Sequence, residues 1–276
     1  MLWKQSWYID YLNEHESPPL PFVGRFTIQN SIKDVVADMR ITLKVGVGEP
    51  RPNQDEFFRG LIKAAETVGI LVMRSGIVGS NTHRRLDVGE FRGFAVSNPL
   101  APVIFVNVAD APTARLFTLV HELAHLWINS SGISSLSVNT SRREEVFCNA
   151  VAGEFLVPEG AFRKKWDASV DWLQNLAPLA DAFKVSKLVI ARRATDLSFV
   201  SKDAYSAYYL AELEAYRGKE KSGGDYYRNA GARNSARFSR AVIAEAMRGN
   251  MLLRDAAKLL GIQPSKLKTY GASVTE

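Results

Sequence analysis

The sequence predicts an α+β fold with a small antiparallel sheet near its middle and a mostly helical C-terminal region. Short apolar segments bounded by Gly, Asn or Pro have the length and composition of strands: Ile70–Arg74, Phe91–Val96 and Val103–Val106. Longer segments before and after them repeat apolar residues with the spacing of amphipathic helices. At 276 residues and 46% hydrophobic composition, the chain is long enough for a large core and two domains.

Changes in pattern and composition divide the chain into four parts. They are an N-terminal extension, a core, a helical segment resembling a helix-turn-helix, and a C-terminal helical domain, at residues 1–54, 55–165, 166–218 and 225–276. A Lys-, Ser- and Gly-rich stretch at 219–225 is the linker before the last part. Early helices are expected over Ser31–Val45 and Asp55–Val68. The last part should hold helices over Phe238–Arg248, Leu252–Leu260 and Pro264–Tyr270.

The segment from Thr118 to Trp127 carries two of the chain's four histidines at a metal-ligand spacing. His121 and His125 are one helical turn apart, so their imidazoles can bind one ion from the same face of a helix. Glu122 lies on the same turn, close enough to reach a water on that ion. This His-Glu-x-x-His arrangement is the motif of zinc peptidases, in which the glutamate is the general base. The alternative is a buried helix whose histidines only form hydrogen bonds with neighbours.

A hydrolytic zinc site needs three protein ligands and one open position for water. The third ligand is expected on a second helix that starts near Ser141 and ends before Pro158. Ser141 and Glu144 have the spacing of a capping box, which gives Glu144 a structural role. Glu145 is therefore preferred as the ligand, and its small helical neighbours let the two helices approach closely. The alternative is that Glu145 only stabilises the helix N-terminus.

Two blocks of sequence surround these residues. They read Arg115-Leu-Phe-Thr-Leu-Val-His-Glu-Leu-Ala-His125 and Glu145-x-x-Cys-Asn-x-x-Ala-x-x-Phe-Leu-Val-Pro158. Both resemble the ImmA/IrrE family of bacterial metallopeptidases, whose second block usually reads Glu-x-x-Ala-Asn-x-Phe-Ala. Cys148 and Val151 are departures from that pattern. The resemblance covers residues 55–160 and extends more weakly over 176–193. It implies a zincin-like peptidase core, and it also places the third ligand on Glu145.

The resemblance implies the chemistry of a zinc hydrolase. Zn²⁺ on His121, His125 and Glu145 would lower the pKa of a bound water and polarise a peptide carbonyl, with Mn²⁺ as the other metal considered. Glu122 would take the proton of the water and pass it to the leaving amine.

Substrate binding needs two further features. An oxyanion donor besides the metal is required, and His83, Arg92 and the tyrosines are the candidates. By analogy with other zinc peptidases, an edge strand just before the metal helix would pair with the extended substrate backbone. Phe91–Val96 is the candidate for that edge strand.

The expected compartment is the cytoplasm, without a membrane partner. No apolar run reaches the roughly 18 residues of a membrane span, and the N-terminus lacks the apolar core of a secretion signal. Cys148 is the sole cysteine, which excludes an intramolecular disulfide. Its preferred role is packing, and the alternative is an oxidation-sensitive thiol near the metal.

The net charge of +6 is unevenly distributed along the chain. Residues 1–181 contain 18 Lys and Arg against 20 Asp and Glu, whereas residues 182–276 contain 17 against 9. This basic excess favours a nucleic acid or another acidic partner, and the alternative is a solvated helical surface.

Two segments of the basic half have a helix-turn-helix pattern, which an ordinary helical hairpin would also show. One begins at Ala256 and places Lys266 and Lys268 on its second helix. The other precedes Arg192 and Arg193, which form its basic end. These four cations are the predicted nucleic-acid contacts.

The function expected from the resemblance is a zinc endopeptidase that cleaves a helix-turn-helix transcriptional repressor after a stress or DNA signal. Members of the family act in stress, mobile-element and anti-phage regulation, and single-stranded DNA activates some of them. The alternatives are a DNA-binding regulator, or a toxin–antitoxin component, in which the zinc site is not catalytic.

Overall fold

The structure is a computed structural model that describes residues 1–46, 53–77, 84, 86–134, 143–217 and 234–275. Its strands are β1 (Leu71–Ser75), β2 (Gly93–Val96), β3 (Val103–Asn107) and β4 (Gly132–Ser134). The N-terminal and central helices are α1 (Leu2–Glu14), α2 (Ile32–Leu43), α3 (Gln54–Thr67), α4 (Pro112–Trp127) and α5 (Arg143–Leu156). The later helices are α6 (Glu159–Lys165), α7 (Trp172–Phe183), α8 (Lys187–Asp196), α9 (Lys202–Arg217), α11 (Ala236–Arg248), α12 (Leu253–Leu260), the 3₁₀ turn η1 (Pro264–Lys266) and α13 (Leu267–Thr275).

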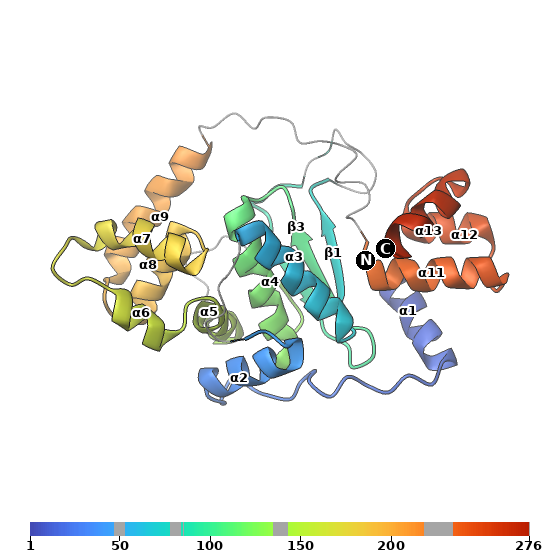
Figure 1. The fold of residues 1–276 in the computed structure, drawn as a ribbon, viewed down its shortest axis with the longest axis horizontal. Helices are drawn as coiled ribbons and strands as arrows, with labels where there is room; N and C mark the ends of the chain where they lie inside the picture. Colours follow the sequence, from blue (N-terminus) through green and yellow to red (C-terminus); the bar gives the residue numbers. More distant parts are fainter. Residues whose placement is uncertain (47–52, 78–83, 85, 135–142, 218–233, 276) are drawn as a thin grey trace.

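Figure 1 shows three parts side by side. The sheet with α2–α5 lies in the middle, α6–α9 lie on one side, and α1 with α11–α13 lies on the other. The predicted α+β class and helical C-terminal region are confirmed. No helix among the described residues is long and apolar enough to cross a membrane.

The described strands form one four-stranded sheet in the order β1-β3-β2-β4. β2 pairs with β3 and with β4 in antiparallel fashion, but β1 pairs with β3 in parallel. The prediction of a wholly antiparallel sheet is therefore wrong for β1. A long connection, rather than a tight turn, joins β1 to β2, so β1 can lie on the far side of β3 and run in the same direction.

The position of β2 also corrects the prediction that Phe91–Val96 is an edge strand. β2 lies between β3 and β4, with Gly93 opposite both Val106 and Ser134. Within the described residues, the edge beside β2 is formed by β4, which follows the metal helix in the chain instead of preceding it.

Both faces of the sheet are covered, because successive side chains in a strand point to opposite faces. Val72 and Ile104 belong to the core that α2–α5 share with one face. Leu71, Met73 and Phe105 belong to a second core, with α1, α11 and α12. Strands buried on both faces explain why β1 and β3 are nearly continuous apolar runs in the sequence.

The helix starts follow from local capping residues. The Asn53 side chain accepts a hydrogen bond from Glu56 N at 2.8 Å and so caps α3. Ser235 caps α11 by accepting a hydrogen bond from Phe238 N. Pro112, whose ring fixes a helical φ, opens α4. The helices predicted for the two ends of the chain are confirmed with boundary shifts of a few residues.

The N-terminal helix packs against the C-terminal helices, although more than 200 residues separate them. Arg237 Nε donates a hydrogen bond of 2.9 Å to Tyr8 Oη of α1, and α3 also contacts this lobe, where Ala236 N donates a hydrogen bond of 3.0 Å to Glu66 Oε1. Gln5 Nε2 donates a hydrogen bond of 2.7 Å to Ala101 O, beside the sheet. Figure 1 accordingly shows both chain ends on the same part of the molecule. The boundaries of the four predicted parts stay a prediction.

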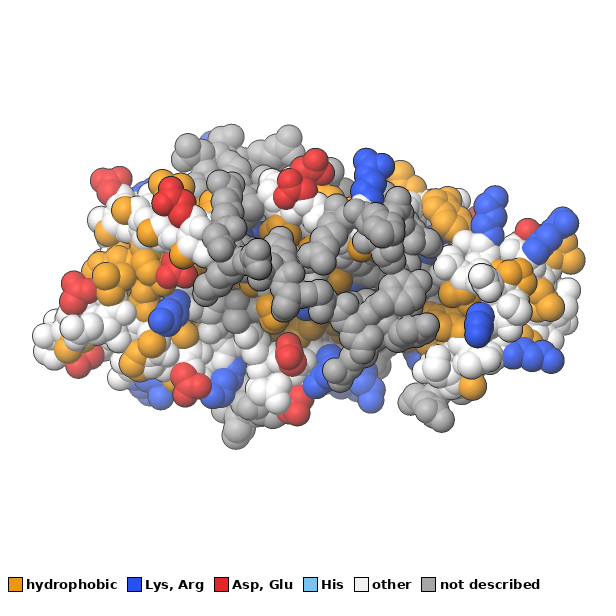
Figure 2. Space-filling model, turned by 90° about the horizontal axis from the view of Figure 1, so that it is seen from above, with side chains coloured by type: hydrophobic (Ala, Val, Ile, Leu, Met, Phe, Trp, Pro, Cys, Tyr) orange, Lys and Arg blue, Asp and Glu red, His pale blue; other side chains and the backbone are white. Residues whose placement is uncertain are grey.

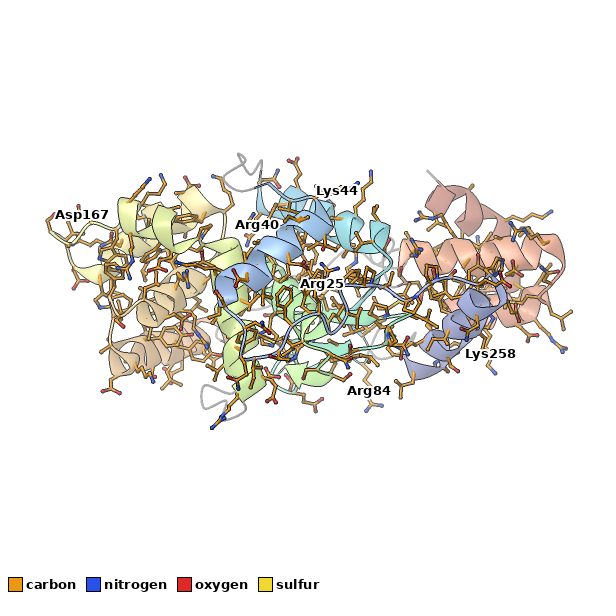
Figure 3. The ribbon with its side chains drawn as sticks, turned by 90° about the horizontal axis from the view of Figure 1, so that it is seen from below. Arg25, Arg40, Lys44, Arg84, Asp167 and Lys258 are labelled. Carbon is orange, nitrogen blue, oxygen red and sulfur yellow. The ribbon has the colours of Figure 1, made fainter. Side chains whose placement is uncertain are left out.

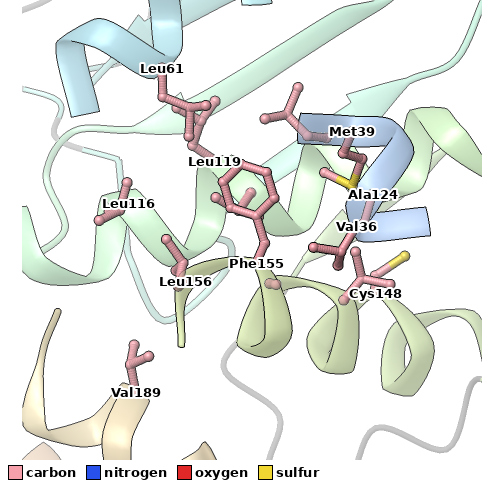
Figure 4. Close-up of a cluster of buried hydrophobic side chains, with 14 of the residues drawn as sticks. Val36, Met39, Leu61, Leu116, Leu119, Ala124, Cys148, Phe155, Leu156 and Val189 are labelled. Atoms are coloured by element: carbon pink, nitrogen blue, oxygen red, sulfur yellow. The ribbon is translucent and has the colours of Figure 1, made fainter. Parts of the chain in front are cut away.

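α2 packs against α5 in the core that both share with α4. Figure 4 shows Met39 of α2 in a buried cluster with Phe155 of α5 and Leu119 of α4. Arg40, on the same helix (Figure 3), donates a hydrogen bond of 2.5 Å to Phe155 O and lies 4.6 Å from the centroid of the Phe155 ring. These contacts fix the end of α5 on α2 and thereby the position of α5 beside α4.

Candidate metal centre

α4 presents the His-Glu-x-x-His motif inside the protein. The side chains of Leu116, Leu119 and Leu123 are fully buried in the core on one side of α4. On the motif itself, His121 is 4% exposed, Glu122 is 0% exposed and His125 is 1% exposed. Polar side chains buried this deeply require partners of their own, and α5 supplies one.

Two imidazoles and one carboxylate converge between α4 and α5. His121 Nε2 lies 3.0 Å from His125 Nε2. Glu145 Oε2 lies 3.1 Å from His121 Nε2, and Glu145 Oε1 lies 3.3 Å from His125 Nε2. Among the described residues, these three side chains form the one group of histidine, cysteine and acidic residues whose ligand atoms could hold a metal ion.

The separations fit a small tetrahedral cation. Ligands about 2.0–2.1 Å from zinc in a tetrahedron lie about 3.3 Å from one another. The contacts of 3.0, 3.1 and 3.3 Å match that spacing. Calcium, with oxygen ligands at about 2.3–2.6 Å and a preference for six to eight of them, does not fit two imidazoles and a carboxylate. The donor set and the spacing therefore suit zinc.

The protonation states also suit a metal site. Burial lowers the pKa of His121 below its ordinary value of 6.5, which keeps the imidazole neutral with a free lone pair on one nitrogen. Burial alone would raise the pKa of Glu145, but the hydrogen bonds and charges of His121 and His125 outweigh it and lower that pKa. Glu145 is therefore an anion at neutral pH.

The structure brings Glu145, and not Glu144, to the histidines. Glu144 is exposed on the first turn of α5, whereas Glu145 is partly buried between the helices. Ser141, the other half of the predicted capping box, lies outside the described residues. Assignment of Glu145 as a metal ligand remains a proposal that this geometry supports.

Gly93 is a site residue that the sequence reasoning missed. A methyl group on Gly93 would lie 3.0 Å from Glu122 Oε1, 2.6 Å from Thr118 Cγ2 and 2.8 Å from Phe105 O. The glycine thus lets β2 lie directly against the turn of α4 that carries Glu122. A glycine inside an apolar strand often marks such a close approach, and that signal was available in the sequence.

Of the two numbered candidates for the oxyanion donor, the structure describes Arg92 alone, and the role stays a prediction. Arg92 Nε lies 3.3 Å from Asp110 Oδ2, before the start of α4. His83 lies outside the described residues.

The predicted nucleic-acid contacts divide into two groups. Arg193 is 5% exposed, donates a hydrogen bond of 2.9 Å from Nε to Val157 O, and forms an ion pair with Glu154. The prediction of a surface contact is therefore wrong for Arg193, whose guanidinium ties α8 to α5. Arg192 is partly exposed and lies 3.6 Å from Asp196. Lys266 and Lys268 are exposed.

Cys148 is a buried packing residue. Figure 4 shows it in the same cluster as Val36 and Ala124, and its exposed fraction is 0%. Burial raises the pKa of its thiol well above the ordinary value, and the nearby carboxylates of Glu145 and Glu122 raise it further. Because the thiolate is the reactive form, this environment disfavours the oxidation-sensitive role.

Comparison with known families supports a peptidase. Residues 65–195 match the family model Peptidase_M78, described as the IrrE N-terminal-like domain. This part of the chain is therefore a peptidase-family domain, and the family resemblance seen in the sequence is confirmed for it. Residues 234–273 match a domain of unknown function, DUF8813. No curated protein is similar enough to the chain to count as a relative.

Proposed function

We propose that the protein is a zinc-dependent endopeptidase whose substrate is a helix-turn-helix transcriptional repressor. The observation that carries the peptidase assignment is the convergence of His121, His125 and Glu145 beside Glu122, inside a peptidase-family domain. Zinc is the proposed metal because the two imidazoles and the carboxylate, and the distances between their ligand atoms, suit it. Mn²⁺ is the other metal to test.

In this proposal each side chain has a distinct role. His121, His125 and Glu145 hold the ion, which supplies Lewis-acid activation of a water and of the scissile carbonyl when bound. Glu122 takes the proton of the attacking water and transfers it to the leaving amine. Gly93 keeps β2 close to the Glu122 carboxylate. In each histidine Nδ1 stays protonated, because Nε2 faces the shared site.

The substrate class and the signal rest on the family resemblance. A repressor encoded beside the peptidase is the proposed substrate, and single-stranded DNA is the proposed activator. A regulatory peptidase of this kind should cleave one bond in its repressor and have low activity on unstructured proteins such as casein.

The test is to incubate the purified, zinc-loaded protein with the repressor encoded by the neighbouring gene, with and without single-stranded DNA, and to measure intact masses. Cleavage at one bond, faster with DNA and much slower for casein, is the expected result. Rapid cleavage of casein at many bonds would contradict a single-substrate role. An intact repressor that instead forms a stable complex would favour the alternative of a binding regulator.

A further inference from the structure

We propose that the C-terminal helical domain, residues 234–275, binds double-stranded DNA through one face of η1 and α13. This face, called the basic face below, consists of Lys266, Lys268, Thr269, Ala272 and Ser273. The proposal does not depend on peptidase activity, and it assigns a role to the segment that matches a domain of unknown function.

α11, α12 and α13 pack around one core, and α12 and α13 are joined by a short connection, as the two helices of a helix-turn-helix are. Phe238, Val242, Ala257, Leu260 and Leu267 are buried together in it. α12 ends at Gly261, whose φ of +69° is the left-handed conformation that glycine adopts most easily. The chain then turns within a few residues into η1 and α13, as between the two helices of this motif.

α13 has a fixed orientation on α11, which defines its outer face. Leu267 and Tyr270 point inward, and the Tyr270 hydroxyl lies 3.0 Å from Ser239 Oγ on α11. Arg240 Nη1 donates a hydrogen bond of 3.2 Å to Val274 O near the end of α13. A methyl group on Gly271 would lie 3.3 Å from Ile243 Cγ2, so the two helices also approach closely.

The outward side of α13 has the chemistry of a groove-binding helix. Lys268, Thr269, Ala272 and Ser273 are exposed. Apart from the lysine they are short, so the helix backbone can approach a groove, and the Thr269 hydroxyl can donate to a phosphate or a base edge. The Ser273 hydroxyl instead donates a hydrogen bond of 2.8 Å to Tyr270 O and can accept one from outside. Lys266 lies on the same side of the chain, one turn before Thr269.

The charge of the domain supports a polyanionic partner. Residues 234–273 contain seven Lys and Arg against two Asp and Glu. Several arginines are engaged within the protein, including Arg237 with Tyr8 and Arg248 with Glu245. Lys258, Lys266 and Lys268 form no ion pair within the part of the chain that the structure describes, and they remain for an external partner.

Figures 2 and 3 agree with this distribution of charge. Figure 2 shows several Lys and Arg side chains and little acidic surface on the lobe formed by α1 and α11–α13. Figure 3 places Lys258 at the outer surface of the same lobe. By contrast, the other predicted helix-turn-helix, α7 and α8, has Arg193 buried against Glu154. The C-terminal domain is therefore the better DNA-binding candidate.

The test is fluorescence anisotropy of a labelled duplex of about 20 base pairs, long enough for two helical turns, with the full-length protein at several salt concentrations. The variant Lys266→Ala/Lys268→Ala should bind about 50-fold more weakly at about 0.1 M salt, and the slope of log affinity against log salt should fall by about 2. The variant Lys266→Arg/Lys268→Arg should keep most of the affinity.

The matched control is Lys164→Ala/Lys165→Ala, which removes the same charge from exposed positions on α6. It should leave the affinity and the salt slope unchanged. A wild-type dissociation constant weaker than about 10⁻⁴ M, the weak limit of non-specific binding, would overturn the proposal. Equal losses in the α6 control would overturn it as well, and so would a loss of single-stranded DNA affinity in Lys266→Ala/Lys268→Ala as large as the loss of duplex affinity. Unchanged melting temperatures will show that the lysine variants fold.

Discussion

Gly93 lies so close to Glu122 that a methyl group added to Gly93 would lie 3.0 Å from Glu122 Oε1. The same methyl group would meet the carbonyl oxygen of Phe105 at 2.8 Å, and this backbone atom cannot move aside cheaply. The position of the proposed general base is therefore set partly by a strand residue that has no side chain.

Gly93→Ala should lower peptidase activity about 100-fold, because displacing a catalytic group by about 1 Å has an effect of that size. Zinc should still bind, because the three atoms nearest to the added methyl group belong to Thr118, Phe105 and Glu122 and not to the proposed ligands. Cleavage rate and zinc content should be measured on the same sample. The matched control is Gly60→Ala on α3, where a methyl group would meet nothing within 4 Å. Normal activity in Gly93→Ala would show that this contact does not position Glu122.

Glu145→Gln should weaken zinc binding by at least about 100-fold, because it removes the anionic ligand of the proposed site. Glu144→Gln, the adjacent exposed acid, is the matched control and should bind zinc normally. Competition with a chromogenic chelator measures both affinities. If Glu144→Gln lost zinc and Glu145→Gln kept it, the ligand assignment would be reversed.

The metal-free protein should become less stable as the pH falls from about 7.5 to 5.5. The pKa of His121 is lowered by burial in the folded state, so the unfolded chain, with its ordinary value of 6.5, binds more protons in this range. The stability that His121 contributes is therefore present above about pH 6.5 and lost below it, at up to about 1.4 kcal/mol per pH unit.

Thermal melting of the chelator-treated protein at each pH measures this dependence. His121→Asn should show a shallower loss, because it lacks the buried imidazole. Identical slopes for the two proteins would assign the pH dependence to other groups.

Arg193→Ala should destabilise the fold by about 3 kcal/mol, because it leaves the mostly buried Glu154 carboxylate without this cation and removes the hydrogen bond to Val157 O. Lys187→Ala, an exposed cation at the start of the same helix, should change the stability by less than about 0.5 kcal/mol. Urea unfolding of the two variants makes the comparison. A stable Arg193→Ala variant would mean that this ion pair does not hold α8 on α5.

The residues of the proposed metal site were predictable because their geometry is local. His121, Glu122 and His125 share one helix, and the capping-box spacing of Ser141 and Glu144 left Glu145 as the preferred ligand. Most helix boundaries were likewise set by residues such as Asn53 and Pro112, which act within one turn.

Features that depend on distant segments were not predictable from the pattern. The apolar run of β1 shows that it is buried, but not that its neighbour is β3 or that the two are parallel. Arg193 was expected on the surface because its partners, Glu154 and Val157, lie on another part of the chain. The packing of α1 against α11 joins residues more than 200 positions apart and leaves no periodic signal.

The most direct test of the central claim is the intact mass of the repressor after incubation with zinc-loaded wild-type protein or with zinc-loaded Glu122→Gln. The account predicts one cleavage by the wild type and a rate at least about 100-fold lower for Glu122→Gln, the lower bound for a general base. Both proteins should carry equal zinc, because Glu122 is not a proposed ligand. Equal cleavage by the two would contradict the assignment of Glu122 as the general base.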